Sequence, residues 1–120
     1  MSATIASSQI HADGASFCVR EWSHGPMDGP PLHVHHSDDE AWHVLSGTLR
    51  FRFADRSEDV GPGGTCFVPA GVAHTFGSPG DVRYLITSTP RVFALIEALH
   101  DPANTDHAAV YRAHDSEIVE

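Results

Sequence analysis

Apolar and polar residues alternate along much of the chain before residue 88. The clearest case lies at residues 48–53, where three apolar residues, Leu49, Phe51 and Phe53, alternate with arginines. Successive side chains of a strand point to opposite faces, so this pattern predicts a strand with one buried face and one exposed face. Shorter patterns predict further strands at residues 15–22, 32–35, 41–45, 65–68, 74–76 and 81–88.

Glycine and proline residues separate these segments. Residues 23–31 predict a loop, Ser46–Gly47 predicts a two-residue hairpin turn, and Pro62–Gly63 predicts the centre of a type II turn. Residues 54–59 are polar and predict a connection between strands. Many short strands with such turns between them predict an all-β fold, either an antiparallel sandwich or a barrel.

The hydrophobic period changes after residue 88. Thr89 suits a helix N-cap, and Pro90 suits the first helical position. An apolar stripe with helical spacing follows, which predicts a helix that docks on the sheet. The stripe consists of Val92, Leu95, Ile96 and Leu99.

The rest of the C-terminal region predicts a second helix and a last strand. Asp101–Pro102 ends the first helix, and residues 105–113 predict a short second helix capped by Asn104 or Thr105. Ile118–Val119 predicts a final strand. Residues 90–113 therefore form a short C-terminal helical segment in this interpretation.

Length and composition indicate one small domain. A chain of 120 residues supports a single core, and we expect an N-terminal arm at residues 1–14 and one β-barrel domain at residues 15–120. Residues 1–8 are small and polar, and predict a loose arm or a strand that adds to a partner's sheet.

Charge and cysteine content restrict the partners and the compartment. The net charge of -9 argues against nucleic acid and anionic membranes, which both require basic surfaces. No apolar stretch is long enough for a membrane span, and no signal peptide is evident. Two distant cysteines, Cys18 and Cys66, predict buried free thiols and a cytoplasmic protein.

Potential metal ligands gather at residues 33–40. His33 and His35 alternate along a strand and therefore point to the same side, and a polar turn then brings Glu40 back toward them. His74 lies downstream, after a Pro-Ala-Gly turn. Three imidazoles and one carboxylate suit iron, manganese, nickel, copper or zinc.

Two segments around these residues resemble the two motifs of the cupin family. The first contains Gly29, His33, His35, Glu40 and Gly47, and the second contains Gly63, Pro69, Gly71, His74 and Ser78. Gly29 is closer to His33 than the family pattern has it, and Ser78 stands where the family usually has asparagine. Neither departure affects a ligand position.

The resemblance implies a jelly-roll barrel, the double-stranded β-helix of cupins, with one divalent transition metal inside it. The implied ligands are His33, His35, Glu40 and His74, with iron, manganese or nickel favoured and zinc or copper as alternatives. The C-terminal helical segment is also similar to that of single-domain cupins like the bacterial quercetin dioxygenases. The cupin resemblance further points to a homodimer.

Each candidate residue also has a structural interpretation. A single histidine is more often structural or solvated, but a buried glutamate among histidines costs several kcal/mol unless it is paired or bound to metal. Asp39 competes with Glu40 if the turn differs by one residue. His36 falls on the wrong side of the strand for a ligand, and we expect a structural or interface role for His43.

Trp42, Phe76 and His24 are candidates for the wall and the mouth of a substrate pocket. Trp42 shares the parity of Glu40, so we expect it to wall the substrate pocket together with Phe76, although core packing explains Trp42 equally well. His24 lies in a predicted loop. His24 is either a residue at the mouth of a site or a solvated loop residue, and the pattern favours the second role.

Three functional hypotheses remain from the sequence. The first is a metal-dependent dioxygenase, an oxidoreductase acting on a small aromatic or enolic compound, in which Glu40 is a ligand and, if it detaches from the metal, the catalytic base. The second is a non-redox isomerase, cyclase or lyase in which a metal polarises a carbonyl or enolate. The third is a non-catalytic module that binds a small molecule. Oxygen uptake separates the first from the other two.

Overall fold

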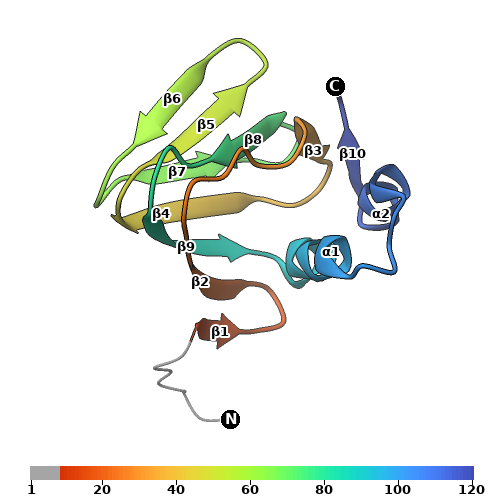
Figure 1. Ribbon diagram of the computed structural model, residues 1–120. Helices are drawn as coiled ribbons and strands as arrows, with labels where there is room; N and C mark the ends of the chain where they lie inside the picture. The colour runs from red at the N-terminus through yellow and green to blue at the C-terminus, as the bar shows by residue number, and fades with distance from the viewer. Residues whose placement is uncertain (1–8) are drawn as a thin grey trace.

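The computed structural model describes residues 9–120 and consists of two five-stranded antiparallel sheets with two short helices after them (Figure 1). The first sheet has the order β1 (Ile10–Asp13), β2 (Cys18–His24), β9 (Val82–Ser88), β4 (Glu40–Ser46) and β7 (Thr65–Val68). The second has the order β10 (Ser116–Ile118), β3 (His33–His35), β8 (His74–Gly77), β5 (Leu49–Phe53) and β6 (Ser57–Val60). This confirms the predicted all-β jelly roll.

The core lies between the two sheets and follows the alternation in the sequence. On β4, Glu40, Trp42 and Val44 are buried, while the residues between them are less covered. On β5, Leu49 and Phe51 are buried and the arginines between and after them are exposed. Side chains of one parity therefore fill the interior, which continues from an apolar core into the region around Glu40.

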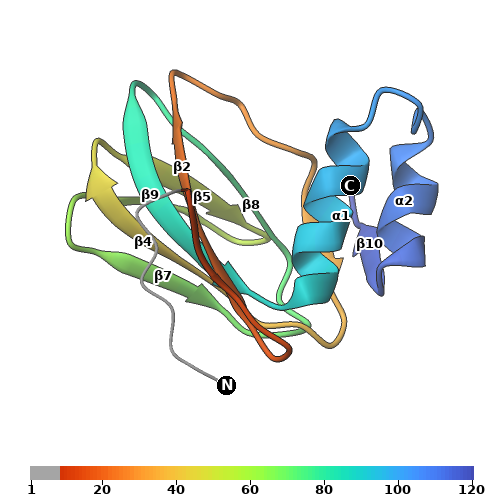
Figure 2. The ribbon, with the colours of Figure 1, turned by 90° about the horizontal axis from the view of Figure 1, so that it is seen from below.

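The C-terminal helical segment is present as predicted. α1 (Pro90–His100) begins after Thr89, whose hydroxyl accepts a hydrogen bond from the backbone N–H of Val92 at 3.2 Å. α2 (His107–Ala113) follows and contacts α1 and β10. Figure 2 shows both helices on one side of the strands, with α1 between the strands and α2.

Several local expectations were wrong in their boundaries. Residues 57–60 form β6 rather than a connection, and β6 pairs along β5 from Leu49 to Arg52. β6 is an edge strand with three exposed side chains out of four, so it carries no apolar alternation that a sequence pattern reveals. The N-cap of α2 is Asp106, which accepts from Ala109 N, because the Asn104 amide instead donates to the carbonyl of Ala98.

The two ends of the chain extend the sheets. β10 begins two residues earlier than expected and pairs with β3, and β1 pairs with β2 at the edge of the first sheet. The expected arm at residues 1–14 overlaps β1, and its first eight residues lie outside the described residues. No helix in residues 9–120 is long and apolar enough to cross a membrane.

Two glycines of the motifs are required by close contacts between segments. Gly29 has φ +82°, and a Cβ there would lie 1.8 Å from the carbonyl oxygen of Phe76. Gly47 has φ +76°, and a Cβ there would lie 2.1 Å from the carbonyl oxygen of Asp81. Any side chain would push the loop before β3 away from β8, or the hairpin after β4 away from the start of β9.

Candidate metal centre

Three histidines from two adjacent strands converge on the buried face of the second sheet. His33 and His35 lie on β3, and His74 on β8 is the direct register partner of His33. All three are at least 95% buried, and their inward ring nitrogens lie within 4.8 Å of one another. They are therefore positioned to bind a metal ion.

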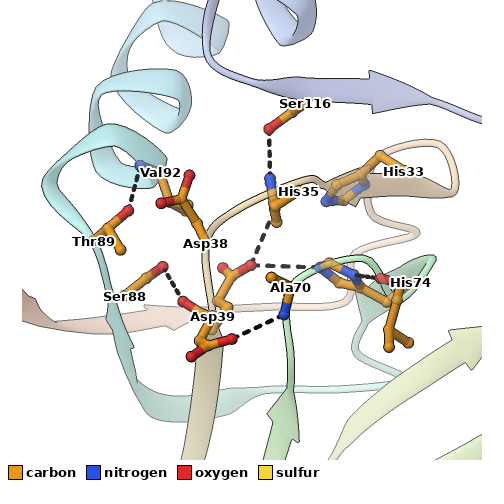
Figure 3. Close-up of polar contacts among 12 residues, drawn as sticks. His33, His35, Asp38, Asp39, Ala70, His74, Ser88, Thr89, Val92 and Ser116 are labelled. Atoms are coloured by element: carbon orange, nitrogen blue, oxygen red, sulfur yellow. Dashed lines mark hydrogen bonds and ion pairs between the residues drawn. The ribbon is translucent and has the colours of Figure 1, made fainter.

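The other ring nitrogen of each histidine is held by an acceptor, and Figure 3 shows this contact for His35. The Nδ1 atoms of His33 and His74 lie 2.8 Å from the carbonyl of Pro31 and 2.9 Å from that of Val72. A carbonyl can only accept, so in both rings Nδ1 carries the proton and Nε2 carries a lone pair.

The outer nitrogen of His35 also donates to an acceptor, which in this case is a serine hydroxyl. Ser116 donates its hydroxyl proton to the carbonyl of His114 at 3.0 Å, so its oxygen accepts from His35 Nδ1 at 2.7 Å. In its neutral form, each of the three rings therefore carries its proton on the outer nitrogen. Such outer hydrogen bonds fix the tautomer and ring orientation of metal-binding histidines.

Glu40 faces the inner nitrogens of two of these rings. Its Oε1 atom lies 3.2 Å from His35 Nε2 and 3.4 Å from His74 Nε2. Both Glu40 Oε1 and His74 Nε2 are buried, and neither has a hydrogen-bond partner among residues 9–120. Acceptors that face one another in a buried space need a cation between them.

The protonation states agree with this need. Burial raises the pKa of Glu40, but hydrogen bonds and positive charge from His35 and His74 outweigh burial and lower the pKa to about 2. A metal ion between these groups would keep the carboxylate ionised in the same way. Burial, and next the neighbouring His74, lowers the pKa of His33 to about 4. At neutral pH the centre thus combines a carboxylate with a neutral imidazole, and this donor set fits a divalent transition metal.

The turn between β3 and β4 selects Glu40 over its neighbour. Asp39 is exposed, and its carboxylate accepts from Ala70 N at 2.9 Å, while its carbonyl accepts from the hydroxyl of Ser88. Asp38 is buried but receives two hydrogen bonds from Arg91 of α1, at 2.8 and 3.1 Å. The carboxylate beside the histidines is therefore that of Glu40.

Other histidines of the sequence lie elsewhere. His36 is exposed, 3.9 Å from a carboxylate oxygen of Glu117. His43 points out of the barrel and hydrogen-bonds Thr65. His24 is not a solvated loop residue, because β2 extends to include it and its ring is bound to Tyr84.

A cavity of about 710 Å³ lies beside the histidines and is mostly apolar. His33, His35 and Glu40 line it at one end, and Trp42 and Phe76 form part of its wall. The expected positions of Trp42 and Phe76 are thus found, and Trp42 also packs in the core against Phe51.

The sequence interpretation missed the contribution of the C-terminal helices to this cavity. The apolar stripe of α1 lines it, and Tyr111 of α2 lies with its ring centroid 5.1 Å from that of His33. Burial raises the pKa of Tyr111 to about 12, so its hydroxyl stays protonated. The helical stripe was the available signal, but it was interpreted only as a docking face.

Comparisons with known proteins place this fold and site in a family. The model of the cupin domain family, Cupin_2, matches residues 21–88, more than half of the chain. Mannose-1-phosphate guanylyltransferase 2 of Escherichia coli O157:H7 is 31% identical over 67 residues, which are 56% of this chain and 14% of that protein. The chain therefore spans only a small part of this relative's length.

Two solved structures show the same architecture. A cupin-2 domain-containing protein of Shewanella frigidimarina has a TM-score of 0.59 at 22% identity, over 68% of this chain and 78% of that chain. The polyketide cyclase RemF of Streptomyces resistomycificus has a TM-score of 0.58 at 25% identity, over 72% of each chain.

Proposed function

The chain belongs to the cupin domain family, and we propose that it is a metal-dependent dioxygenase that acts on a small aromatic or enolic compound. One observation carries the proposal: Glu40 Oε1 and His74 Nε2 are buried, face one another and have no hydrogen-bond partner among the described residues, and His35 Nε2 lies 3.2 Å from the same carboxylate oxygen. We assign His33, His35, Glu40 and His74 as the ligands of one divalent metal. Iron, manganese and nickel are favoured, and zinc and copper are the alternatives.

A metal held by these four residues would supply open coordination positions for a chelating substrate and, if it is redox-active, one-electron chemistry. The chain's own groups do the rest. The apolar wall around Trp42 and Phe76 excludes water and holds an aromatic ring. The Glu40 carboxylate is ionised at neutral pH and would take the proton of an enol or phenol once it detaches from the metal.

The metal assignment is tested by composition. Alanine substitution at His33, His35, Glu40 or His74 lowers the metal content of the purified protein, whereas His36→Ala serves as the matched control and leaves it unchanged. Full occupancy in the His74→Ala protein would remove that residue from the ligand set.

The reaction is tested by oxygen uptake. Protein reloaded with iron, manganese or nickel is expected to consume oxygen in the presence of a flavonol, a diketone or a catechol. Glu40→Gln should lower the rate at least about a hundredfold, the usual size of a lost general base, while Glu117→Gln, an exposed carboxylate on β10, should not. No uptake with any of these metals, in a protein that takes up zinc from mixed-metal medium, contradicts the dioxygenase assignment.

A second candidate function is favoured by the likeness to the polyketide cyclase RemF, which extends over most of the chain. In this alternative the same residues bind a metal that polarises a carbonyl or enolate without redox change, as in a cyclase, isomerase or lyase. Conversion of a candidate substrate to an isomeric product without oxygen uptake supports it. Recovery of a tightly bound ligand unchanged supports a non-catalytic binding protein.

The assembly and the compartment complete the proposal. We propose a homodimer, supported by Phe67 and Ile10, large apolar side chains exposed on the two edge strands of the first sheet. We propose a cytoplasmic location, supported by the free thiols of Cys18 and Cys66. A small molecule, rather than nucleic acid or a membrane, is the partner that the acidic charge and the apolar cavity favour.

A further inference from the structure

A second polar cluster lies in the cavity, away from the histidines, and consists of Trp22, His24 and Tyr84. Trp22 and His24 are two residues apart on β2 and share one face of the strand. Trp22 is the direct register partner of Tyr84 on β9, and all three residues line the cavity. We call this group the distal cluster.

The sheet register gives the separation between the distal cluster and the histidines. On β4, Glu40 pairs with Ser88 of β9, whereas Val44 pairs with Tyr84. Four residues of an extended strand span roughly 13 Å, so Tyr84 lies about that far along the sheet from Glu40. Trp42 pairs with Ile86 halfway between, and both residues line the cavity. The cavity thus has two polar ends with an apolar wall between them.

The hydrogen bonds of the distal cluster have a defined direction. His24 Nδ1 lies 2.8 Å from the carbonyl of Gly25 and donates to it, so in the neutral ring Nε2 accepts from the Tyr84 hydroxyl at 2.8 Å. The Tyr84 oxygen then keeps a lone pair that can accept. The indole N–H of Trp22 is buried and has no acceptor among the described residues. The cluster therefore offers one acceptor and one donor, which is what a hydroxyl group needs.

No arginine lines the cavity, and away from the metal end its basic side chains are the histidines His24, His100 and His107. The chain has seven arginines and no lysine. Six arginines form ion pairs with acidic side chains: Arg20, Arg50, Arg52, Arg56, Arg83 and Arg91. The seventh, Arg112, is exposed on α2. At the distal end, a phosphate or carboxylate group would therefore meet no arginine and would lose its hydration at a large desolvation cost.

We infer that the cavity binds an uncharged, flat molecule of at least two rings, which chelates at the histidine end and presents a hydroxyl group to Tyr84 and Trp22 at the other end. Trp42 and Ile86 contact the rings between these ends. The chelating end rests on the proposed function, whereas the hydroxyl end rests on the distal cluster alone. A single ring with a chelating group is too short to reach both ends.

A matched series of ligands tests the inference on zinc-loaded protein, which binds the probes without oxidising them. The series consists of maltol, unsubstituted flavonol, flavonol with a hydroxyl at the para position of its phenyl ring, and flavonol with a carboxylate at that position. All four share the same chelating hydroxy-ketone and differ only in length and in the distal group. Isothermal titration calorimetry gives the dissociation constants, and quenching of Trp22 and Trp42, the two tryptophans of the chain, reports entry into the cavity.

The hydroxylated flavonol is expected to bind about tenfold tighter than the unsubstituted one, the worth of one well-placed hydrogen-bonded group. Maltol and the carboxylate should bind more weakly than either. Tyr84→Phe and Trp22→Phe should each remove most of the preference for the hydroxyl. Tyr111→Phe is the matched control, because it removes another tyrosine hydroxyl from the cavity wall and should leave the preference unchanged.

The outcomes separate this inference from the proposed function. If the three flavonols bind equally in a zinc-dependent manner, or if both Tyr84→Phe and Trp22→Phe keep the preference, the inference is overturned and the metal site stands. If the hydroxyl preference persists and depends on Tyr84 while iron-loaded protein consumes no oxygen, the inference stands and the dioxygenase assignment fails. Binding of none of the four probes to zinc-loaded protein overturns both.

Discussion

At the scale of single residues, the site depends on side chains that never touch a metal. Each inner imidazole nitrogen has its lone pair because the outer nitrogen donates to an acceptor, and for His35 this acceptor is Ser116. Ser116 is 2% exposed and comes from β10, a strand that follows both helices. The last strand of the chain thus fixes the tautomer of a residue on β3.

We therefore expect Ser116→Ala to weaken metal binding without removing a ligand. The buried His35 Nδ1–H would lose its acceptor, and loss of such an outer partner usually costs about 10- to 100-fold in metal affinity. Competition with a chromogenic chelator measures the affinity, and Ser57→Ala on the exposed edge strand β6 is the control. An unchanged affinity in the Ser116→Ala protein would show that His35 is held by packing alone.

The sequence predicts some of these residues well, for a physical reason. Strand parity and one polar turn are local, so they place His33, His35 and Glu40 together without knowledge of the fold. The choice between Glu40 and Asp39 depends on the exact length of the turn, which the sequence leaves open and which the structure decides in favour of Glu40. The role of Ser116 does not follow from local patterns, because it depends on the pairing of β3 with β10, which are separated by most of the chain.

At the scale of elements, α1 is held over the cavity by a contact with the ligand-bearing turn. Arg91, in the first turn of α1, makes two hydrogen bonds to Asp38 and lies 3.3 Å from a carboxylate oxygen of Asp115. Asp38 is 5% exposed, and the two hydrogen bonds from Arg91 satisfy its buried carboxylate oxygens. The contact joins α1 to the turn that delivers Glu40 and to the segment before β10.

Arg91→Ala should lower the free energy of unfolding by about 2 kcal/mol, because a buried carboxylate loses hydrogen bonds from a charged donor. The half-exposed position of Arg91 keeps the effect below that of a fully buried ion pair. Chemical denaturation measures the change, and Arg112→Ala on the exposed side of α2 is the control. In the Asp38→Asn background the cost should shrink, and an equal cost in both backgrounds would refute the coupling.

The elements themselves were largely predictable, and the exceptions have a common cause. Periodicity identified α1, β5 and β9 because each buries one apolar face. β6 was missed because its stability comes from backbone pairing and an Arg50–Asp59 ion pair rather than from burial. The sequence could not show that α1 lines a cavity. A helix face that lines a cavity and a helix face that packs in a core are both apolar stripes, and only the tertiary structure distinguishes them.

At the scale of the whole molecule, exposed apolar side chains on the edge strands favour association. Phe67 on β7 is 60% exposed and lies opposite Ala41 of β4, and edge strands also offer unpaired backbone groups. We expect a homodimer at micromolar concentration by light scattering, and Phe67→Ser should shift it toward the monomer. Val119→Ser, at an exposed position near the C-terminus, is the control. A monomer mass for the unmodified protein at this concentration would contradict the proposal.

The metal couples the site to the stability of the fold. A metal that binds only the folded state adds about 2.7 kcal/mol at a hundredfold excess over its dissociation constant. A chelator should therefore lower the melting temperature, yet the stripped protein should still unfold cooperatively, because the apolar core between the sheets lies mainly outside the centre. A stripped protein without any cooperative transition would mean that the metal is structural.

Acid should destabilise the stripped protein in a defined range. The pKa of His33 is about 4 in the fold, so between pH 4 and the ordinary value near 6.5 the unfolded chain binds a proton that the folded chain does not. Stability therefore falls as the pH falls through this range, by at most about 3 kcal/mol from this residue. The pKa of Glu40 is about 2, compared with an ordinary value of about 4.5, so this residue extends the loss of stability to still lower pH.

The slope of stability against pH is measured by melting temperatures of chelator-treated protein, from neutral pH down to pH ~4.5. His33→Gln should flatten this slope, whereas the control His36→Gln, at an exposed position, should not. A melting temperature that rises as the pH falls would contradict the prediction, because the folded protein would then bind more protons than the unfolded chain.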